Sequence, residues 1–241
     1  MSIHWEPLAN LAQSIHRGWR IELNPTKPAE GIRFTSESTP SMSWNALSVH
    51  PIPKHSLQPE ELFVRQEDLI TRFAQNPEDD FGFQIDWRLM APSETFDVGV
   101  EIWLTVQTSL LESVPRLGIQ SQGLPSGWTC WKHRELIDDE VGDPVVEATS
   151  SSSELGVAAL MWSREQTSFL WLIEPSDQDH IDWNSHAEDA TQSGTLFGHF
   201  MEKGVIRRAR MQLFACAGLL QKSDVSRAYR ALAERDLPLT A

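Results

Sequence analysis

The clearest alternation of apolar and polar residues in this chain lies between residues 80 and 107. Apolar side chains occupy every second position from 81 to 89 and again from 98 to 106. A period of two places such residues on one face of an extended chain, which indicates two half-buried strands. The link at 91–96 contains a proline and small polar residues, so the two strands are predicted to pair as an antiparallel hairpin.

Weaker alternation predicts several more strands. The segment 61–75 reads as two strands joined by a tight polar turn, with a helix as the alternative interpretation. Prolines interrupt residues 25–59, which suits edge strands and connections better than helices. Short strands are predicted at 19–23, 31–35, 45–49 and 116–119.

Two further pairs of segments are interpreted as hairpins. Residues 155–162 and 168–173 are nearly continuous apolar runs, as expected of strands that are buried on both faces and therefore central in a sheet. Residues 195–202 and 205–214 flank a Lys-Gly turn and are predicted to pair with each other as the last hairpin.

Helical spacing occurs near both ends of the chain. Val225, Tyr229 and Leu232 recur along one face of a helix that we expect over 223–236. Residues 6–13 show a weaker helical spacing.

Together these elements predict an all-β protein, a large antiparallel two-sheet β-sandwich with a short C-terminal helix packed on it. The length of 241 residues suits one hydrophobic core, so residues 1–241 are expected to form a single domain. The layout resembles the galactose-mutarotase-like supersandwich, which is a likeness of architecture and brings no residue motif with it. One fold serves many functions, so this architecture alone does not determine the function.

Composition narrows the classes of partner. A net charge of −14 argues against nucleic acid and against anionic membrane surfaces, since both are bound through lysine and arginine. No apolar run approaches the roughly 18 residues of a membrane span, and the first residues lack the basic and apolar regions of a secretory signal. We therefore expect a cytoplasmic protein. Its two cysteines, Cys130 and Cys216, show no paired spacing and are expected to be reduced thiols.

Polar positions on the predicted strands supply the candidate binding residues. If the 80–107 hairpin and the 205–214 strand share a sheet, one concave face would carry Gln84, Asp86, Arg88, Glu101, Trp103, Arg208 and Arg210. Charged and amide groups make directional hydrogen bonds to hydroxyl groups, and an indole can cover the apolar face of a sugar ring. We therefore expect a module that binds a carbohydrate or a related polar ligand. The alternative is an ordinary outer face whose ion pairs contribute little.

Two other functions remain open. A carbohydrate-active enzyme on the same fold, an epimerase, lyase or glycosidase, would use Asp86, Glu101, Arg88 or a histidine. Asp86 and Glu101 would be the two carboxylates of a glycosidase. A protein–protein interaction domain would present exposed tryptophans in an apolar patch, and the chain has ten tryptophans against one tyrosine.

No motif indicates a cofactor or a metal. The chain lacks a phosphate-binding loop, a serine-hydrolase elbow and a zinc-protease motif. His199 and Glu202 lie three residues apart in a predicted strand and would project to opposite faces, so they make a poor acid–base pair. One acidic cluster lacks the glycine and the distal glutamate of a calcium-binding loop and is interpreted as a solvated loop; it contains Asp177, Asp179, His180 and Asp182.

Overall fold

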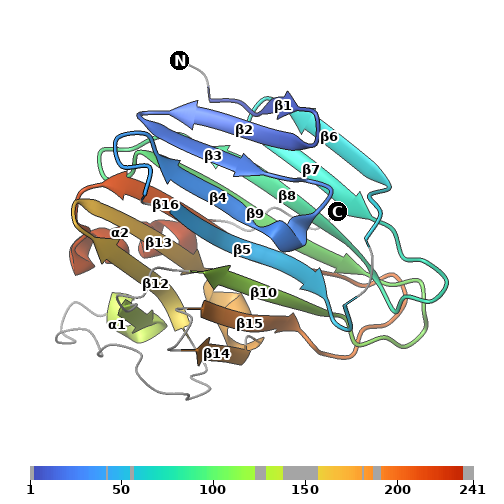
Figure 1. Cartoon of the computed structure of the whole chain (residues 1–241). Helices are drawn as coiled ribbons and strands as arrows, with labels where there is room; N and C mark the ends of the chain where they lie inside the picture. The colour runs from blue at the N-terminus through green and yellow to red at the C-terminus, as the bar shows by residue number, and fades with distance from the viewer. Residues whose placement is uncertain are drawn as a thin grey trace.

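In the computed structural model the chain forms two antiparallel β-sheets that pack face to face (Figure 1). The structure describes residues 3–41, 43–54, 57–122, 129–137, 157–180, 182–186 and 191–235, and for 178–180 and 182–186 it describes the backbone only. This arrangement confirms the predicted all-β sandwich.

Sheet A contains eight strands within these residues, and every neighbouring pair is antiparallel. In order across the sheet they are β1 (Glu6–Leu8), β2 (Leu11–His16), β3 (Trp19–Leu23), β4 (Ile32–Ser36), β5 (Ser43–Pro51), β10 (Arg116–Gln122), β15 (Thr191–Phe197) and β14 (Asp182–His186).

Sheet B also has eight described strands, again all antiparallel. Their order is β11 (Thr129–Lys132), β12 (Val157–Arg164), β13 (Thr167–Ile173), β16 (Ile206–Ala217), β9 (Val98–Gln107), β8 (Gly82–Met90), β7 (Asp68–Phe73) and β6 (Glu61–Arg65). The predicted hairpin at 80–107 is confirmed as β8 and β9, and the strand interpretation of 61–75 is confirmed as β6 and β7.

The core between the sheets is rich in aromatic rings. Trp44 of sheet A stacks on Phe34 and contacts Phe169 of sheet B, with ring centroids 5.5 and 5.2 Å apart. Trp19, also on sheet A, meets the same phenylalanine edge-on at 5.6 Å. These rings bury large apolar areas and prefer tilted or offset contacts, so they join the two sheets through the core.

A second apolar layer covers part of the outer face of sheet B. The helices α1 (His133–Ile137) and α2 (Lys222–Ala233) pack there against β12, β13 and β16. Every residue of β13 is consequently buried, which confirms the prediction of a hairpin buried on both faces. The final helix, expected over 223–236, is confirmed; it begins at Lys222 and ends at Ala233. Among the described residues, no helix has the length and apolarity that crossing a bilayer requires.

The prediction of a last hairpin was wrong. β15 pairs with β10 and β14 in sheet A, whereas β16 lies between β13 and β9 in sheet B. Phe197 and Gly198 adopt positive φ angles of 69° and 78°, so the chain turns away at the end of β15 and crosses to the other sheet. Alternation in a sequence reports which residues are buried but not which strand is the neighbour.

The helical interpretation of residues 6–13 was also wrong. They form β1 and the start of β2, joined by a two-residue turn in which Ala9 has a φ of 47°. The apolar residues there are few, so their spacing fitted a helix and a short hairpin equally well.

Candidate functional site

All seven predicted binding residues lie on the outer face of sheet B, so the condition that their strands share a sheet is met. With Thr105 and Gln212 they form three cross-strand rows on β8, β9 and β16, which we call the polar strip: Gln84 with Thr105 and Arg208, Asp86 with Trp103 and Arg210, and Arg88 with Glu101 and Gln212.

Glu101 is committed to contacts inside the protein. It is 1% exposed, and its carboxylate accepts hydrogen bonds from Trp103 Nε1 (3.2 Å), Gln212 Nε2 (2.8 Å) and Arg235 Nη1 (2.6 Å). A buried carboxylate requires this kind of compensation. Glu101 therefore has no open side for a ligand, and the geometry does not favour a catalytic pair with Asp86.

Arg210 is buried in the same way, at 1% exposed. Its Nη2 donates to the carbonyl oxygens of Leu232 (2.8 Å) and Arg235 (3.4 Å), and its guanidinium carbon lies 5.2 Å from the centroid of the Trp103 ring. Burial lowers the pKa of Arg210, while the carboxylates of Glu174 and Glu101 act in the opposite direction. The end of α2 and the residues that follow it thus cover one side of the polar strip.

The remaining side of the polar strip is accessible. Asp86 is half-buried and accepts a hydrogen bond from Gln84 Nε2 at 2.6 Å. Burial raises the pKa of Asp86, and both this hydrogen bond and the charge of Arg208 lower it. Trp103 is half-buried and Arg208 is exposed. Arg88 is exposed as well, but its guanidinium binds Asp68 through two hydrogen bonds.

A pocket of about 220 Å³ adjoins the polar strip at Arg208. It forms where β13 ends and the short 3-10 helix η2 (Pro175–His180) takes its place beside β16. The Glu174 N–H donates to the Arg210 carbonyl oxygen (3.0 Å), and the Arg210 N–H donates to Asp177 Oδ2 (2.7 Å). Its lining residues are Ser176, Asp177, Leu196, Phe197, His199, Arg207, Arg208 and Ala209.

Asp177 is the most perturbed carboxyl group of this pocket. Its pKa is raised to about 7, mainly by burial; the nearby Glu174 carboxylate also raises it, and the Arg210 hydrogen bond and charge lower it. Glu174 is itself buried and accepts a hydrogen bond from Ser176 Oγ. Such a carboxyl group exchanges its proton near neutral pH, which is the property of a general acid or base.

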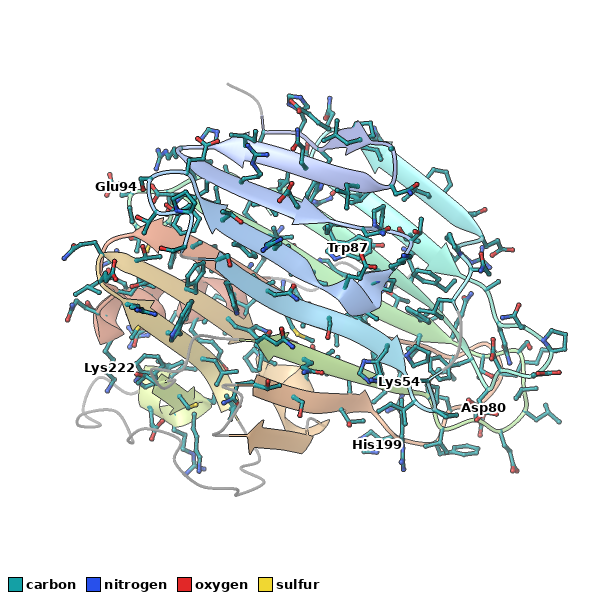
Figure 2. The ribbon with its side chains drawn as sticks, viewed as in Figure 1. Lys54, Asp80, Trp87, Glu94, His199 and Lys222 are labelled. Carbon is teal, nitrogen blue, oxygen red and sulfur yellow. The ribbon has the colours of Figure 1, made fainter. Side chains whose placement is uncertain are left out.

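The sequence pattern indicates for Asp177 only a place in an acidic loop. The side chains of Asp179, His180 and Asp182 lie outside the described residues. His199 lies in the connection after β15 and not in a strand, and Figure 2 shows it at one end of the sandwich. Only the folded chain brings it to the pocket of Asp177, because η2 and the connection after β15 are far apart in the sequence.

Sheet A has its own hollow on the outer face. A space of about 640 Å³ contains a cross-strand row on β3, β4, β5 and β10, namely Glu22, Arg33, Asn45 and Gln122. A neighbouring hollow of about 500 Å³ shares Glu22, Arg33 and Ser43 with it. These side chains make an alternative place for a polar ligand, and they lack the aromatic ring that the polar strip provides.

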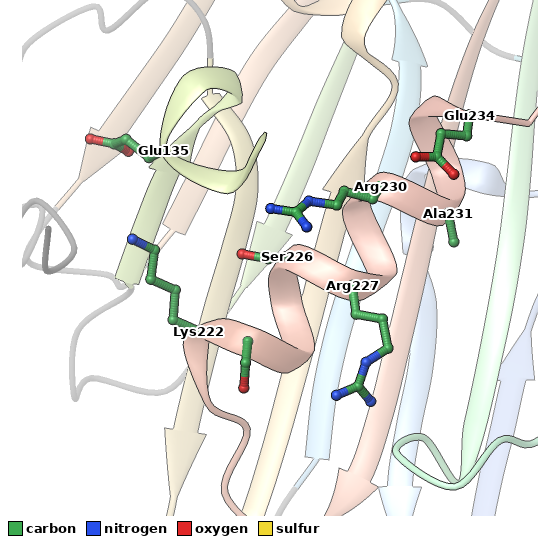
Figure 3. A pocket seen from close by; sticks show the side chains of 8 residues that line it. Glu135, Lys222, Ser226, Arg227, Arg230, Ala231 and Glu234 are labelled. Carbon is green, nitrogen blue, oxygen red and sulfur yellow. The ribbon is translucent and has the colours of Figure 1, made fainter. Parts of the chain in front are cut away.

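A further hollow of about 630 Å³ follows the exposed side of α2 (Figure 3). Figure 3 shows Arg230 and Ser226 turned toward α1, and Arg227 turned the other way. Arg230 Nη2 donates to the Ile137 carbonyl oxygen at 2.9 Å, so this side chain connects the two helices.

Tryptophan exposure bears on the interaction-domain hypothesis. Among the tryptophan side chains that the structure describes, Trp103 is half-buried and the others are at most 2% exposed: Trp5, Trp19, Trp44, Trp87, Trp131, Trp162 and Trp171. The side chains of Trp128 and Trp183 lie outside the described residues. The described tryptophans are thus mainly core residues.

No protein-family model matches this chain, and no curated protein matches it. Among solved structures, the 4-alpha-glucanotransferase from Thermococcus litoralis is similar over 90% of this chain and 40% of its own, with a TM-score of 0.41 and 9% identity. A heparinase III is similar over 92% of this chain and 35% of its own, with a TM-score of 0.39 and 9% identity. This chain therefore spans less than half the length of either protein, and similarity at this level carries no argument about function.

Proposed function

We propose that the protein binds a carbohydrate, or a ligand of the same polar and polyhydroxylated kind, at Asp86, Trp103 and Arg208. The observation that carries the proposal is the strand register, which brings a carboxylate, an indole and a guanidinium to the accessible side of one face. These are the groups that bind sugar hydroxyls and the apolar face of a sugar ring.

The buried side of the polar strip supports this assignment by holding the accessible side in place. Trp103 donates to Glu101 and has the Arg210 guanidinium over its ring, and Asp86 is bonded to Gln84. Side chains that are already ordered lose less conformational entropy when a ligand binds.

Arg208 extends the proposed site toward the pocket of η2. It shares that pocket with Arg207 and His199, which add cationic or hydrogen-bonding groups near the strip. An acidic group on the ligand would therefore be bound best at this end, and neutral sugars would depend mainly on Trp103 and Asp86.

Isothermal titration calorimetry with neutral and uronic-acid-containing oligosaccharides tests the proposal. Arg208→Ala and Trp103→Leu are the test variants, and Arg33→Ala, an exposed arginine on the outer face of sheet A, is the matched control. Each test variant should weaken binding by roughly tenfold or more, as removal of a central interface residue does.

Two results would count against the site. Absence of binding heat for the wild type with every oligosaccharide would refute carbohydrate binding. Loss of binding in Arg33→Ala, with binding retained in Arg208→Ala, would place the ligand in the hollow of sheet A.

Catalysis is a second candidate function because Asp177 has a pKa of about 7 in a pocket that also contains His199. The pH dependence of the turnover rate of a bound oligosaccharide should then follow the ionisation of Asp177. The Asp177→Asn variant should still bind the oligosaccharide but should not turn it over. A wild type that binds an oligosaccharide and leaves it unchanged over days would argue against an enzyme.

A further inference from the structure

Strand β6 is one of the two edge strands of the described sheet B, opposite β11, as Figure 1 shows. Its neighbour among the described strands is β7, on one side only, and all five of its residues are exposed. Leu62, Phe63 and Val64 are 45%, 54% and 40% exposed. An unpaired edge with three consecutive apolar residues is a template for pairing with another strand.

The free edge presents the backbone groups of Leu62 and Val64. The Leu89 N–H donates to the Glu67 carbonyl oxygen at 2.9 Å, which makes these two residues a hydrogen-bonded pair just beyond the β7–β8 ladder. Along antiparallel strands, hydrogen-bonded pairs alternate with non-hydrogen-bonded pairs. The backbone groups of the odd-numbered residues of β7 therefore bond to β8, and those of the even-numbered residues bond to β6. Their partners on β6 are 61, 63 and 65, and the groups of Leu62 and Val64 therefore point away from β7.

The sequence of β6, Glu-Leu-Phe-Val-Arg, is complementary to itself in the antiparallel direction. When two copies are aligned about Phe63, Glu61 of each lies opposite Arg65 of the other. In a parallel alignment Glu61 would face Glu61, and like charges directly opposite each other are unfavourable. The charges thus select one direction and one register.

We propose that two copies of this chain associate through β6, antiparallel and centred on Phe63, so that their sheets B join into one continuous sheet. Leu62 of one copy and Val64 of the other then form a hydrogen-bonded pair, in which the N–H of each residue donates to the carbonyl oxygen of the other. The two Phe63 residues form a non-hydrogen-bonded pair, the kind in which side chains lie closest. This interface uses none of the residues of the polar strip and is independent of the proposed ligand.

The expected association is weak. A single pair of five-residue strands buries much less surface than the roughly 1,200 Å² of a stable interface. We therefore expect a dissociation constant of about 10 µM to 1 mM for the dimer. Within its own chain, Glu61 Oε2 lies 3.8 Å from Arg72 Nη1, and these side chains are 45% and 39% exposed; such a long, solvent-screened contact competes little with a new partner.

Sedimentation analysis over a concentration series, with charge variants, tests both the association and its register. Glu61→Arg and Arg65→Glu each place like charges opposite each other and should weaken the dimer roughly tenfold. The double variant carrying both substitutions restores opposite charges and should recover wild-type association. A wild type that remains monomeric at about 1 mM, or single variants that associate as the wild type does, would overturn the proposal.

Two more variants separate association from folding. Val64→Pro removes an N–H that points to the free edge, so it should abolish dimers while the circular dichroism and the melting temperature stay close to wild type. Phe63→Cys should form a disulfide-linked dimer under oxidation, and Glu61→Cys should not, since residue 61 faces residue 65. Equal cross-linking at both positions would disprove the register.

Discussion

Asp177 should make the stability of this protein depend on pH in a way that a single substitution removes. Its pKa rises from an ordinary value of 3.8 to about 7, mainly because of burial. At about 1.4 kcal/mol for each pH unit, this difference corresponds to about 4 kcal/mol of unfolding free energy. The native state binds the Asp177 proton more tightly than the unfolded chain does, so this stability is present below about pH 4 and is lost as the pH rises toward 7.

Asp177→Asn is the suitable perturbation because an amide keeps the oxygen that accepts the Arg210 N–H but cannot ionise. The variant should match the wild type near pH 4 and exceed its unfolding free energy by up to about 4 kcal/mol at pH 8. Urea unfolding followed by tryptophan fluorescence at each pH measures this difference directly, as a midpoint shift of roughly 1–2 M at pH 8.

The control is Glu78→Gln, which removes one exposed carboxylate and thereby accounts for the general effect of net charge. A difference between wild type and Asp177→Asn that stays constant from pH 4 to pH 8 would refute the reasoning. So would a difference that stops growing above about pH 5, since the pKa of Asp177 in the folded protein would then lie below about 5 instead of near 7.

Three further predictions concern the packing of sheet B. Arg235→Ala should lower the unfolding free energy measured in urea by about 1–2 kcal/mol, because buried Glu101 loses a charged partner. The effect stays small because Arg235 is half-exposed, and an unchanged urea midpoint would contradict the prediction. Gly99→Ala should destabilise by about 1–3 kcal/mol in the same assay, since its Cβ would lie 2.7 Å from the Phe214 ring; wild-type stability would show that the ring moves freely. Cys216, whose pKa burial raises to about 12, should resist thiol reagents at pH 8 until the protein unfolds, and rapid labelling of Cys216 in a folded Cys130→Ser variant, which lacks the partly buried second thiol, would disprove this.

The sequence was sufficient to predict the sandwich because its strongest signal, the alternation at 80–107, depends on burial alone. Burial also explains why the apolar run at 168–173 was correctly predicted to be covered on both faces. Sheet membership depends on contacts between distant segments, and the pairing of 195–202 with 205–214 failed for that reason. The finer resemblance to the supersandwich and the single-domain organisation stay predictions.

The candidate site was predicted in part for the same reason. Strand alternation placed Asp86, Trp103 and Arg208 on one face, and the register brought them together. The burial of Glu101 and Arg210 could not be predicted from the pattern, because charged residues usually lie at the surface, and it takes the folded chain to bring Arg235 to Glu101 and the end of α2 to Arg210. The elevated pKa of Asp177 likewise comes from tertiary burial.

The position of β16 has a consequence for how the molecule is assembled. This strand is the last of the chain's described strands to be synthesised, yet it fills the middle of sheet B, between β13 and β9. Until it emerges from the ribosome, β9 and β13 each have one long, apolar edge without its native partner. We therefore expect the sheet to close late and through contacts between distant segments, which slows folding and exposes strand edges of the nascent chain to aggregation.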